Sequence, residues 1–409
     1  MKINYNIKDK FDLTLFLSAL ILILIGLLAI YSSTYNHPTA KGNFNKQLVF
    51  GVVSVVVFFI VFFLPPRTFR VLSIPSFLVS LALLAAVLFM GKTVYGAKSW
   101  MSIGLFGFQP SEFAKIGTIL FLAHWLSAPK RDINNLKELF YTICLSLIPV
   151  FFILMEPDLG TAIVYISISL VMIFWSGINL FGIFVVVSPG VILFASLFGT
   201  PMFLFALGAV IVALILFKQD LFTSGTVFVI NLSAGFIFEI ILKVLKPHQV
   251  KRILSFVDPT SDPLGSGYNA LQAQVAIGSG GLIGKGFMQG NQTQLRFIPE
   301  QWTDFIYCVV GEEFGFVGSI IVLVLFLIIF VKLLNYTSSA GDKFDKLVIV
   351  GILTLFFTHF TINIGMNLGI TPVIGLPLPF ISHGGSSILA NMVLLGIVFN
   401  IYKNRKYHT

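Results

Sequence analysis

The sequence is poor in charged residues: Asp, Glu, Lys and Arg make up 11% of its 409 residues, whereas hydrophobic residues make up 57%. A water-soluble globular protein would lack the polar surface that it needs, so we expect the lipid bilayer to be the solvent for most of this chain. Cysteine is also scarce. The two cysteines, Cys144 and Cys308, lie in or beside apolar runs without the spacing of a metal site or a disulfide framework, which favours a packing role.

The formal net charge of +9 is not gathered in a single basic stripe. The Lys and Arg residues are scattered between apolar runs, so they indicate membrane topology and argue against nucleic-acid binding. If the amino terminus is cytoplasmic, the inner segments carry fifteen basic residues and the short outer loops carry four, which are Lys41, Lys46, Lys92 and Lys98. This bias predicts that both termini lie on the cytoplasmic side.

Apolar runs long enough to cross a bilayer, about 20 residues each, recur along the chain. They predict an all-α polytopic integral membrane protein with about 10–12 transmembrane helices. The run from Phe11 is too long for a cleaved signal peptide, so we assign it as the first span. The pair ending at Phe198 and Phe217 contains Pro189 and Pro201 and could instead be re-entrant. The candidate spans are residues 11–32, 47–64, 71–90, 111–127, 139–155, 161–175, 180–198, 202–217, 225–245, 305–331, 347–368 and 387–401.

A long polar segment, residues 246–304, precedes the tenth predicted helix and is extracytoplasmic in this topology. Its basic residues do not contradict the assignment, because long loops cross the membrane largely regardless of charge. Between Lys243 and Val257, basic and apolar residues interleave at near-helical spacing. That pattern is typical of a helix in the headgroup plane, although an aqueous extension of the preceding helix would also produce it.

Many glycines fill the second half of this segment, but they do not form a P-loop. Ser279 stands where that motif needs its first glycine, and Gly286 stands where it needs Ser or Thr. A flexible glycine linker would explain the glycines. It would not explain Asp304, a carboxylate placed where the chain enters the bilayer.

Ionisable residues inside predicted spans need a partner or a function, because burying one in hydrocarbon costs roughly 2.5 kcal/mol or more. Glu239 and Lys243 are four residues apart on one helix and can pair. Glu112 and Lys115, three apart at the head of the fourth predicted helix, allow the same structural explanation. Asp158, between two spans on the same outer side, is placed to cap the helix that follows.

Five strings of the sequence look like the successive signatures of one membrane protein family, in the family's order. They are FGFQPSEFAK, EPDLGTA, GSGYNALQAQVAIGSGGLIGKG, FIPEQWTDFIYCVVGEEFGFVG and NIGMNLGITPVIGLPLPFISHGGSS. On these motifs the chain resembles the bacterial shape, elongation, division and sporulation (SEDS) peptidoglycan polymerases, and most closely their RodA branch. The resemblance treats residues 1–409 as a single transmembrane domain. Departures from the usual pattern are Lys98 and Ser99 for an Arg pair, Trp302 for His, His383 for Tyr, and extra helices at 202–217 and 225–245.

The resemblance implies polymerisation of lipid II, a disaccharide-peptide on a polyprenyl diphosphate, at the outer face of the cytoplasmic membrane of a bacterium. An acceptor sugar 4-hydroxyl would displace the diphosphate with inversion, so one general base suffices and no covalent nucleophile is needed. The departing diphosphate needs positive charge, from basic side chains or a divalent cation such as Mg or Mn. The family further implies a class B penicillin-binding protein as partner and no organic cofactor.

By motif position, the resemblance makes Asp304 the general base, Lys115 a contact to the diphosphate and Glu112 the residue that orients Lys115. Basic, aromatic and amide side chains in or near the same strings are expected to bind substrate: Lys98, Trp100, Gln109, Lys285 and Arg296. Structural or gating roles are expected for Glu312, Glu313, Ser382 and His383.

Two other classes of function fit parts of the pattern. Intramembrane charge and glycine-interrupted helices also suit a transporter, such as a flippase for a lipid-linked precursor. Against this, the polar groups gather at the outer boundary, whereas a translocation path should span the midplane. A scaffold that only recruits a cell-wall synthase would not need buried carboxylates. The sequence therefore favours the enzyme.

Overall fold

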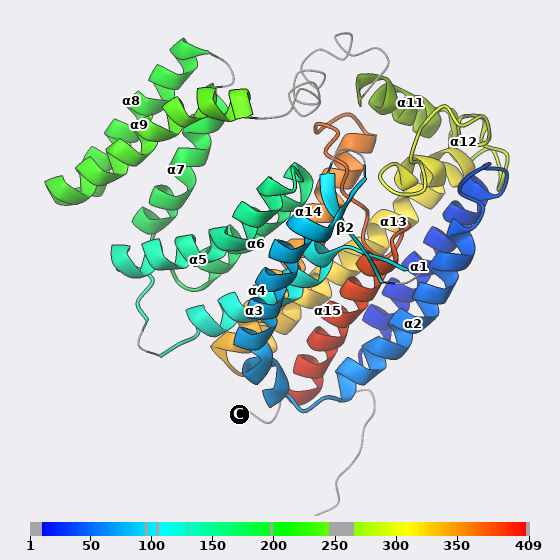
Figure 1. Ribbon diagram of the computed structural model, residues 1–409, viewed down its shortest axis with the longest axis horizontal. Helices are drawn as coiled ribbons and strands as arrows, with labels where there is room; N and C mark the ends of the chain where they lie inside the picture. Colours follow the sequence, from blue (N-terminus) through cyan, green and yellow to red (C-terminus); the bar gives the residue numbers. More distant parts are fainter. Residues whose placement is uncertain are drawn as a thin grey trace, which may run out of the picture.

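Helices make up most of the protein (Figure 1). The computed structural model describes residues 10–94, 97–103, 106–129, 131–196, 199–244 and 266–405. The helices are α1 (Leu13–Thr34), α2 (Asn43–Phe63), α3 (Arg67–Met90), α4 (Pro110–Leu126), α5 (Leu136–Met155), α6 (Leu159–Trp175), α7 (Leu180–Ser196), α8 (Thr200–Phe217), α9 (Leu221–Val244), α11 (Ser266–Ser279), α12 (Asn291–Gln294), α13 (Ile306–Ser339), α14 (Lys343–Asn367) and α15 (Gly385–Asn404).

The helices meet the requirement for an integral membrane protein. Within the described ranges, eight are long and apolar enough to cross a membrane: α1, α2, α3, α5, α8, α13, α14 and α15. Helices α6 and α7 and the Leu221–Phe236 part of α9 are shorter apolar helices, and α4 has 17 residues. Each predicted span coincides with one of these helices, so the predicted all-α polytopic fold is confirmed.

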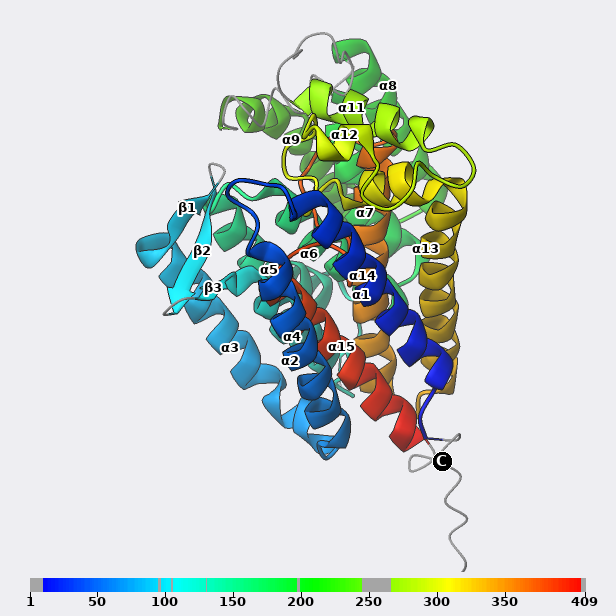
Figure 2. The ribbon, with the colours of Figure 1, turned by 90° about the vertical axis from the view of Figure 1, so that its right-hand side faces the viewer.

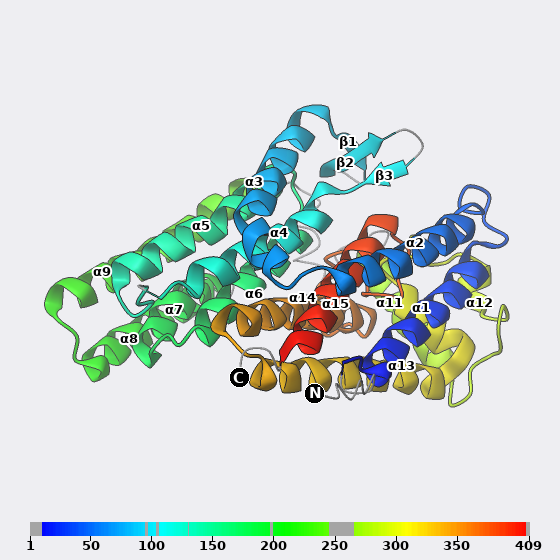
Figure 3. The ribbon, with the colours of Figure 1, turned by 90° about the horizontal axis from the view of Figure 1, so that it is seen from below.

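The centre of the bundle is formed by α14 and α15 (Figure 3). In their most apolar windows, 67% of α14 and 72% of α15 is buried inside the protein, compared with 17% of α8. Helix α15 packs against α2, and α14 packs against α13, α6 and α4. The polar side chains that α14 carries are therefore shielded from the surrounding lipid.

Helices α7, α8 and α9 project to one side of this bundle (Figures 1 and 3). They pack on one another around a small apolar cluster of their own, which includes Ile192, Leu207 and Val227. The pair that could have been re-entrant consists of two continuous helices, and α8 is long enough to span. Most of the α8 surface faces outward, as expected for a helix whose neighbour is lipid.

One face of the molecule collects the start of α1 and the ends of α13 and α15. Asp12 accepts hydrogen bonds from Lys332 Nζ at 2.7 Å and from the Tyr336 hydroxyl at 2.5 Å. The Tyr336 ring lies 4.2 Å from that of Tyr402 on α15. Helices α11 and α12 lie at the opposite face (Figure 1). The ends of the bundle therefore meet on one side, as the predicted topology requires.

Helix α13 is broken at Gly315, whose φ of 65° and ψ of −158° are not helical. The glycine-rich segment 280–286 fills the break. The amide of Phe316 donates to Gly281 O at 2.9 Å, and the amide of Val317 donates to Leu282 O at 3.1 Å. Unpaired backbone groups are costly at membrane depth, so the inserted segment satisfies groups that the break would otherwise leave free.

The other edge of the break is paired in the same way. The amides of Lys285 and Gly286 donate to the carbonyls of Glu312 and Glu313 at 3.0 and 3.1 Å. Gly284, between the two edges, has a φ of +82°, and a Cβ there would lie 2.1 Å from Glu313 O. A Cβ at Gly280 would likewise lie 2.0 Å from Gly311 O, so close backbone approach accounts for these two glycines of the stretch read as a possible flexible linker.

A small antiparallel sheet lies between α3 and α4, in a stretch predicted only as an outer loop. Its strands are β1 (Lys92–Val94), β2 (Ala97–Ile103) and β3 (Phe106–Phe108), in the order β1-β2-β3. Figure 2 shows the sheet and the α11–α12 region as separate parts of the molecule. The expected headgroup helix between Lys243 and Val257 lies outside the described residues, as do the side chains of the Glu239 and Lys243 pair.

Candidate functional site

A buried ion pair stands at the start of α4. Pro110 occupies the first turn, where a missing amide proton costs nothing, and Glu112 lies in the same turn. Lys115 Nζ donates to Glu112 Oε1 at 2.7 Å, with only 2% and 5% of the two side chains exposed. An ion pair so well buried is held in one geometry, unlike a pair at a water-exposed surface.

The ammonium of Lys115 has a second partner that sequence reasoning missed. Nε2 of His359, on α14, lies 3.2 Å from Lys115 Nζ. The other ring nitrogen, Nδ1, lies 3.0 Å from the carbonyl oxygen of Pro377. His359 is 3% exposed, so its ring is part of the packed interior. The available signal was an imidazole inside the predicted span 347–368, where an ionisable group needs an explanation.

The turn between α5 and α6 adds two carboxyl groups to this region. Asp158 caps α6, accepting from the amide of Thr161 at 3.0 Å and from its hydroxyl at 2.7 Å, which confirms the predicted cap. Glu156 is fully buried. Burial, together with the nearby negative charge of Asp158, raises the pKa of Glu156 to about 8. Glu156 is therefore largely neutral at pH 7 and adds little charge beside Lys115.

Several polar atoms around the ion pair are buried without a hydrogen-bond partner among the described residues. They are Ser111 Oγ, Glu112 Oε2 and both carboxyl oxygens of Glu156. Buried polar atoms are nearly always paired, so such a group is characteristic of a site that takes a polar ligand or water.

Asp304 lies two residues before α13, and its backbone is attached to α14. Its carbonyl oxygen accepts from Asn363 Nδ2 at 2.8 Å and from Asn367 Nδ2 at 3.2 Å. His359 and Asn363 are four residues apart on α14, about 6 Å along the helix axis. Helix α14 therefore brings the Asp304 segment and the Lys115 ammonium within roughly one helical turn of each other along its length.

The two residues before Asp304 are held by the segment that follows α14. The amide of His383 donates to Trp302 O at 2.9 Å, and the Ser382 hydroxyl donates to Thr303 O at 2.6 Å. Three successive carbonyls, from Trp302 to Asp304, thus accept hydrogen bonds from the C-terminal part of the chain. The expected structural roles of Ser382 and His383 agree with these contacts.

Two of the predicted substrate-binding residues lie in strand β2. The Lys98 ammonium donates to Leu88 O at 2.7 Å and to Phe89 O at 3.1 Å, which caps the last turn of α3. Trp100 packs over Gly107 of β3. These contacts give both residues a structural role, and their contact with substrate stays a prediction.

A third predicted binding residue, Gln109, lies one turn before Glu112. It occupies the N-cap position of α4, and its backbone amide donates to Ser386 Oγ at 3.2 Å. Ser386 belongs to α15, so this bond ties the head of α4 to the head of the central helix. Gln109 is thus close to Glu112 in both sequence and space, as the site requires.

Lys285 and Arg296 belong to a different part of the protein. Lys285 Nζ donates to the buried Glu312 at 2.9 Å, and Arg296 donates to the carbonyl of Asn36. Glu312 also accepts from the amide and hydroxyl of Thr293, at 2.9 and 2.8 Å. Glu312 is therefore a structural anchor for the outer segment. Among the described residues, none of the hydrogen bonds made by the side chains of this group reaches Lys115.

Glu313 belongs to the same structural network. Its carboxylate accepts from the Ser32 hydroxyl, and Gln294 Nε2 donates to Ser32 Oγ at 3.0 Å. Glu313 is 1% exposed. These bonds fasten the outer half of α13 to the end of α1, in agreement with the expected structural role.

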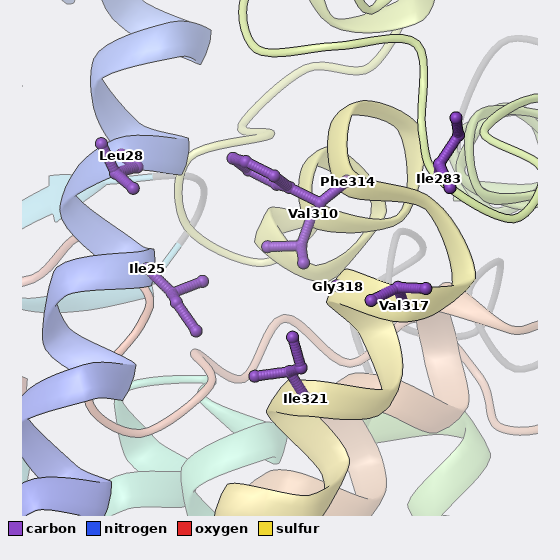
Figure 4. A pocket seen from close by; sticks show the side chains of 8 residues that line it. All are labelled: Ile25, Leu28, Ile283, Val310, Phe314, Val317, Gly318 and Ile321. Atoms are coloured by element: carbon purple, nitrogen blue, oxygen red, sulfur yellow. The ribbon is translucent and has the colours of Figure 1, made fainter.

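An apolar cavity of about 310 Å³ lies between α1 and α13, beside the break at Gly315 (Figure 4). It has no charged lining residue and so lacks groups for acid–base chemistry. Its lining includes Ile25, Leu28, Ile283, Val310, Phe314 and Ile321. An apolar lining of this kind suits a hydrocarbon chain.

The sequence left open whether a divalent cation helps to neutralise the diphosphate. Among the described residues, no group of three or more His, Cys, Asp or Glu side chains is placed to hold a metal ion. Lys115 already occupies one carboxylate oxygen of Glu112. A cation brought in with a diphosphate therefore stays a prediction.

Comparison with known sequences identifies relatives over nearly the whole length. The family of cell cycle proteins named for FtsW, RodA and SpoVE matches residues 12–203 and 180–407. Peptidoglycan glycosyltransferase RodA of Treponema pallidum is 38% identical over 426 residues, covering 96% of this chain and 98% of the relative. Peptidoglycan glycosyltransferase MrdB of Escherichia coli K12 is 32% identical, covering 98% of this chain and 95% of the relative.

Solved structures have the same fold. A chain from a peptidoglycan synthase complex that coordinates polymerization and crosslinking matches with a TM-score of 0.73 and 27% identity, covering 97% of this chain and 98% of that chain. RodA of Thermus thermophilus matches with a TM-score of 0.64 and 24% identity, over 97% of each chain, which indicates the fold alone. On sequence and fold together, this chain belongs to the FtsW, RodA and SpoVE family of bacterial multi-pass membrane proteins.

Proposed function

We propose that this chain is a peptidoglycan glycosyltransferase that polymerises lipid II at the outer face of the cytoplasmic membrane. The observation that carries the proposal is the joint attachment of two groups to α14. Lys115 contacts His359, and the backbone of Asp304 is held by Asn363. A basic group for a leaving diphosphate and a carboxylate for an attacking hydroxyl are thus supported by one buried helix.

Lys115 is assigned to the diphosphate. An ammonium has three donors, and Glu112 and His359 take two of them. The third can point to a phosphate oxygen, where fixed positive charge stabilises the negative charge that develops as the glycosidic bond to diphosphate breaks. Glu112 holds the ammonium in place and offers its second carboxylate oxygen, Oε2, to a polar group of the substrate.

Asp304 is assigned as the general base. It is partly buried at the start of α13, and its main chain is fixed on both sides by hydrogen bonds. Its carboxylate accepts the proton of the acceptor sugar 4-hydroxyl while that oxygen attacks the anomeric carbon and the diphosphate leaves from the opposite side. This is one inverting displacement, so two carboxylates acting in sequence are not required.

The membrane arrangement supports these assignments. The start of α1 and the end of α15 share one face, and a cytoplasmic location for this face places the head of α4 on the outer side. The relative in a peptidoglycan synthase complex supports a penicillin-binding protein of class B as partner, with which the chain would serve cell-wall elongation.

The substitution Asp304→Asn tests the proposal. Asparagine keeps the shape of aspartate but cannot accept the proton, so we expect polymerisation of purified lipid II, read as glycan on a gel, to fall at least about 100-fold. The control is Asp220→Asn. Asp220 is exposed at the start of α9, where it accepts from the amide of Thr223 at 3.0 Å, a bond that asparagine can also accept.

Three results would contradict the assignment or the function. Polymerisation by correctly folded Asp304→Asn at the wild-type rate would remove Asp304 from catalysis. An equal loss in Asp220→Asn would point to a general effect of the substitution. Failure of the wild type with every class B partner, together with movement of labelled lipid II across proteoliposomes, would replace the enzyme with a flippase.

A further inference from the structure

His359 lies in the middle of α14 with both ring nitrogens engaged. Nδ1 is 3.0 Å from the carbonyl oxygen of Pro377, and Nε2 is 3.2 Å from Lys115 Nζ. Only 3% of the residue is exposed. The ring therefore links a buried ammonium on α4 to the loop that connects α14 with α15.

The two partners fix the protonation state of the ring. A carbonyl oxygen only accepts, so Nδ1 must carry the proton. An ammonium only donates, so Nε2 must offer its lone pair. Both contacts are satisfied by one species, the neutral imidazole with its proton on Nδ1. A doubly protonated ring would place two cations 3.2 Å apart in a buried site and is excluded on electrostatic grounds.

This arrangement restricts Lys115 more tightly than the ion pair does. A lysine side chain is flexible, and a single carboxylate contact leaves the ammonium free to rotate about that bond. With Glu112 Oε1 at 2.7 Å and His359 Nε2 at 3.2 Å as two fixed acceptors, the direction of the third N–H is set. The imidazole thereby determines where the remaining donor points.

The loop behind the ring also reaches the other half of the candidate site. Its Leu376 carbonyl accepts from Asn363 Nδ2 at 2.7 Å, and Asn363 donates from the same nitrogen to Asp304 O. Pro377, the next residue, is the partner of His359. The adjacent carbonyls of Leu376 and Pro377 thus hold both the residue that contacts the Asp304 backbone and the residue that contacts the Lys115 ammonium.

We propose that His359 is a positioning residue, which aims the free donor of Lys115 at the diphosphate of the lipid substrate through its Nε2 lone pair. The proposal rests on the function proposed above for Lys115. It assigns no proton transfer to the ring, which stays neutral throughout the reaction.

Two substitutions separate the two ring contacts. His359→Gln can place an amide oxygen near the Nε2 position and keep an acceptor for Lys115, but it loses the donor to Pro377. His359→Asn can place an amide nitrogen near the Nδ1 position and keep that donor, but it loses the acceptor for Lys115. The proposal predicts opposite orders for activity and stability. His359→Gln should be the more active variant, and His359→Asn should unfold at the higher temperature.

The measurement is the rate of lipid II polymerisation at saturating substrate, with KM determined in parallel. We expect kcat of His359→Asn to fall about 10- to 100-fold, a range set by small misplacement of a catalytic group, with little change in KM. His359→Gln should stay within about tenfold of the wild type. Affinity for polyprenyl diphosphate should follow kcat, because this product carries the charge that develops on the leaving group.

The outcomes discriminate between the alternatives. Equal activity of the two variants, or activity that follows thermal stability, would reduce His359 to a packing residue and overturn the proposal. Higher activity in His359→Asn than in His359→Gln would overturn it too, because activity would then depend on the hydrogen bond from Nδ1 to Pro377 and not on the Lys115 contact. An inactive wild type would instead refute the proposed function. If either variant fails to fold, the affinity of the other for polyprenyl diphosphate decides: retention in His359→Gln or loss in His359→Asn supports the proposal, and the reverse refutes it.

Discussion

Replacing Lys115 with Met removes an ammonium from a closed environment while keeping a side chain of similar length. Its partner Glu112 is 4% exposed, and the ion pair spans 2.7 Å. Removing one member of such a pair leaves an uncompensated buried charge, which costs about 3–5 kcal/mol of folding free energy. We expect Lys115→Met to lower the unfolding temperature in detergent by several degrees and to abolish lipid II polymerisation.

The double substitution Lys115→Met with Glu112→Gln distinguishes a structural role from a catalytic one. Both charges are gone, so the penalty of an unpaired carboxylate disappears and most of the lost stability should return. Polymerisation should remain absent, because the diphosphate still lacks its ammonium. The assay compares the unfolding temperature and the glycan yield of wild type, single and double variants at equal amounts of folded protein.

A matched control is provided by Arg131→Met. Arg131 and Glu138 also form an ion pair of 2.7 Å, but their side chains are 28% and 34% exposed. Such partly exposed pairs contribute about 0–1 kcal/mol, and the Arg131 guanidinium also lies over the Trp125 ring, a contact of about 0.5–1 kcal/mol. This variant should therefore lose much less stability than Lys115→Met and should retain polymerisation. Wild-type polymerisation by the double variant would refute the assignment of Lys115 to the diphosphate. An unchanged unfolding temperature in Lys115→Met alone would refute the description of the pair as buried.

Two further predictions concern topology and the broken helix. In a background without native cysteines, cysteines at the exposed positions Ser102 and Gln289 should react with an impermeant thiol reagent from outside, whereas one at Ser339 should not; the reverse pattern would invert the topology. Gly284→Ala should lower the unfolding temperature sharply, because the positive φ and two strained hydrogen bonds together cost about 3 kcal/mol or more of folding free energy. Gly278→Ala, which has open space around its Cβ, should have little effect, and equal unfolding temperatures for the two variants would argue against the inserted segment.

The helices could be predicted from the sequence because each depends on a local property. A membrane span requires only a run of apolar residues of sufficient length. The cap by Asp158 requires only a carboxylate three residues before Thr161. The pairing of Glu112 with Lys115 is equally local, because residues three positions apart on a helix lie on the same face. These features can therefore be predicted without knowledge of the tertiary structure.

The remaining features depend on contacts that no local sequence pattern encodes. His359 is 244 residues away from Lys115, so no pattern of spacing could connect them. Lys98 was expected to bind substrate, which stays a prediction, whereas the contact of its ammonium with carbonyls at the end of α3 was not foreseen. Such a contact requires the turn that the small sheet produces, and this stretch was predicted only as an outer loop.

The insertion of residues 280–286 into α13 has a consequence for how the family's sequences can vary in length. Loops usually tolerate the gain or loss of a residue. Here, Gly281 and Leu282 accept from the amides of Phe316 and Val317, while the amides of the following pair, 285 and 286, donate to carbonyls 312 and 313. Removal of one residue between these pairs would put one edge of the break out of register. A stretch that reads as a permissive glycine linker is therefore fixed in length by the helix it completes.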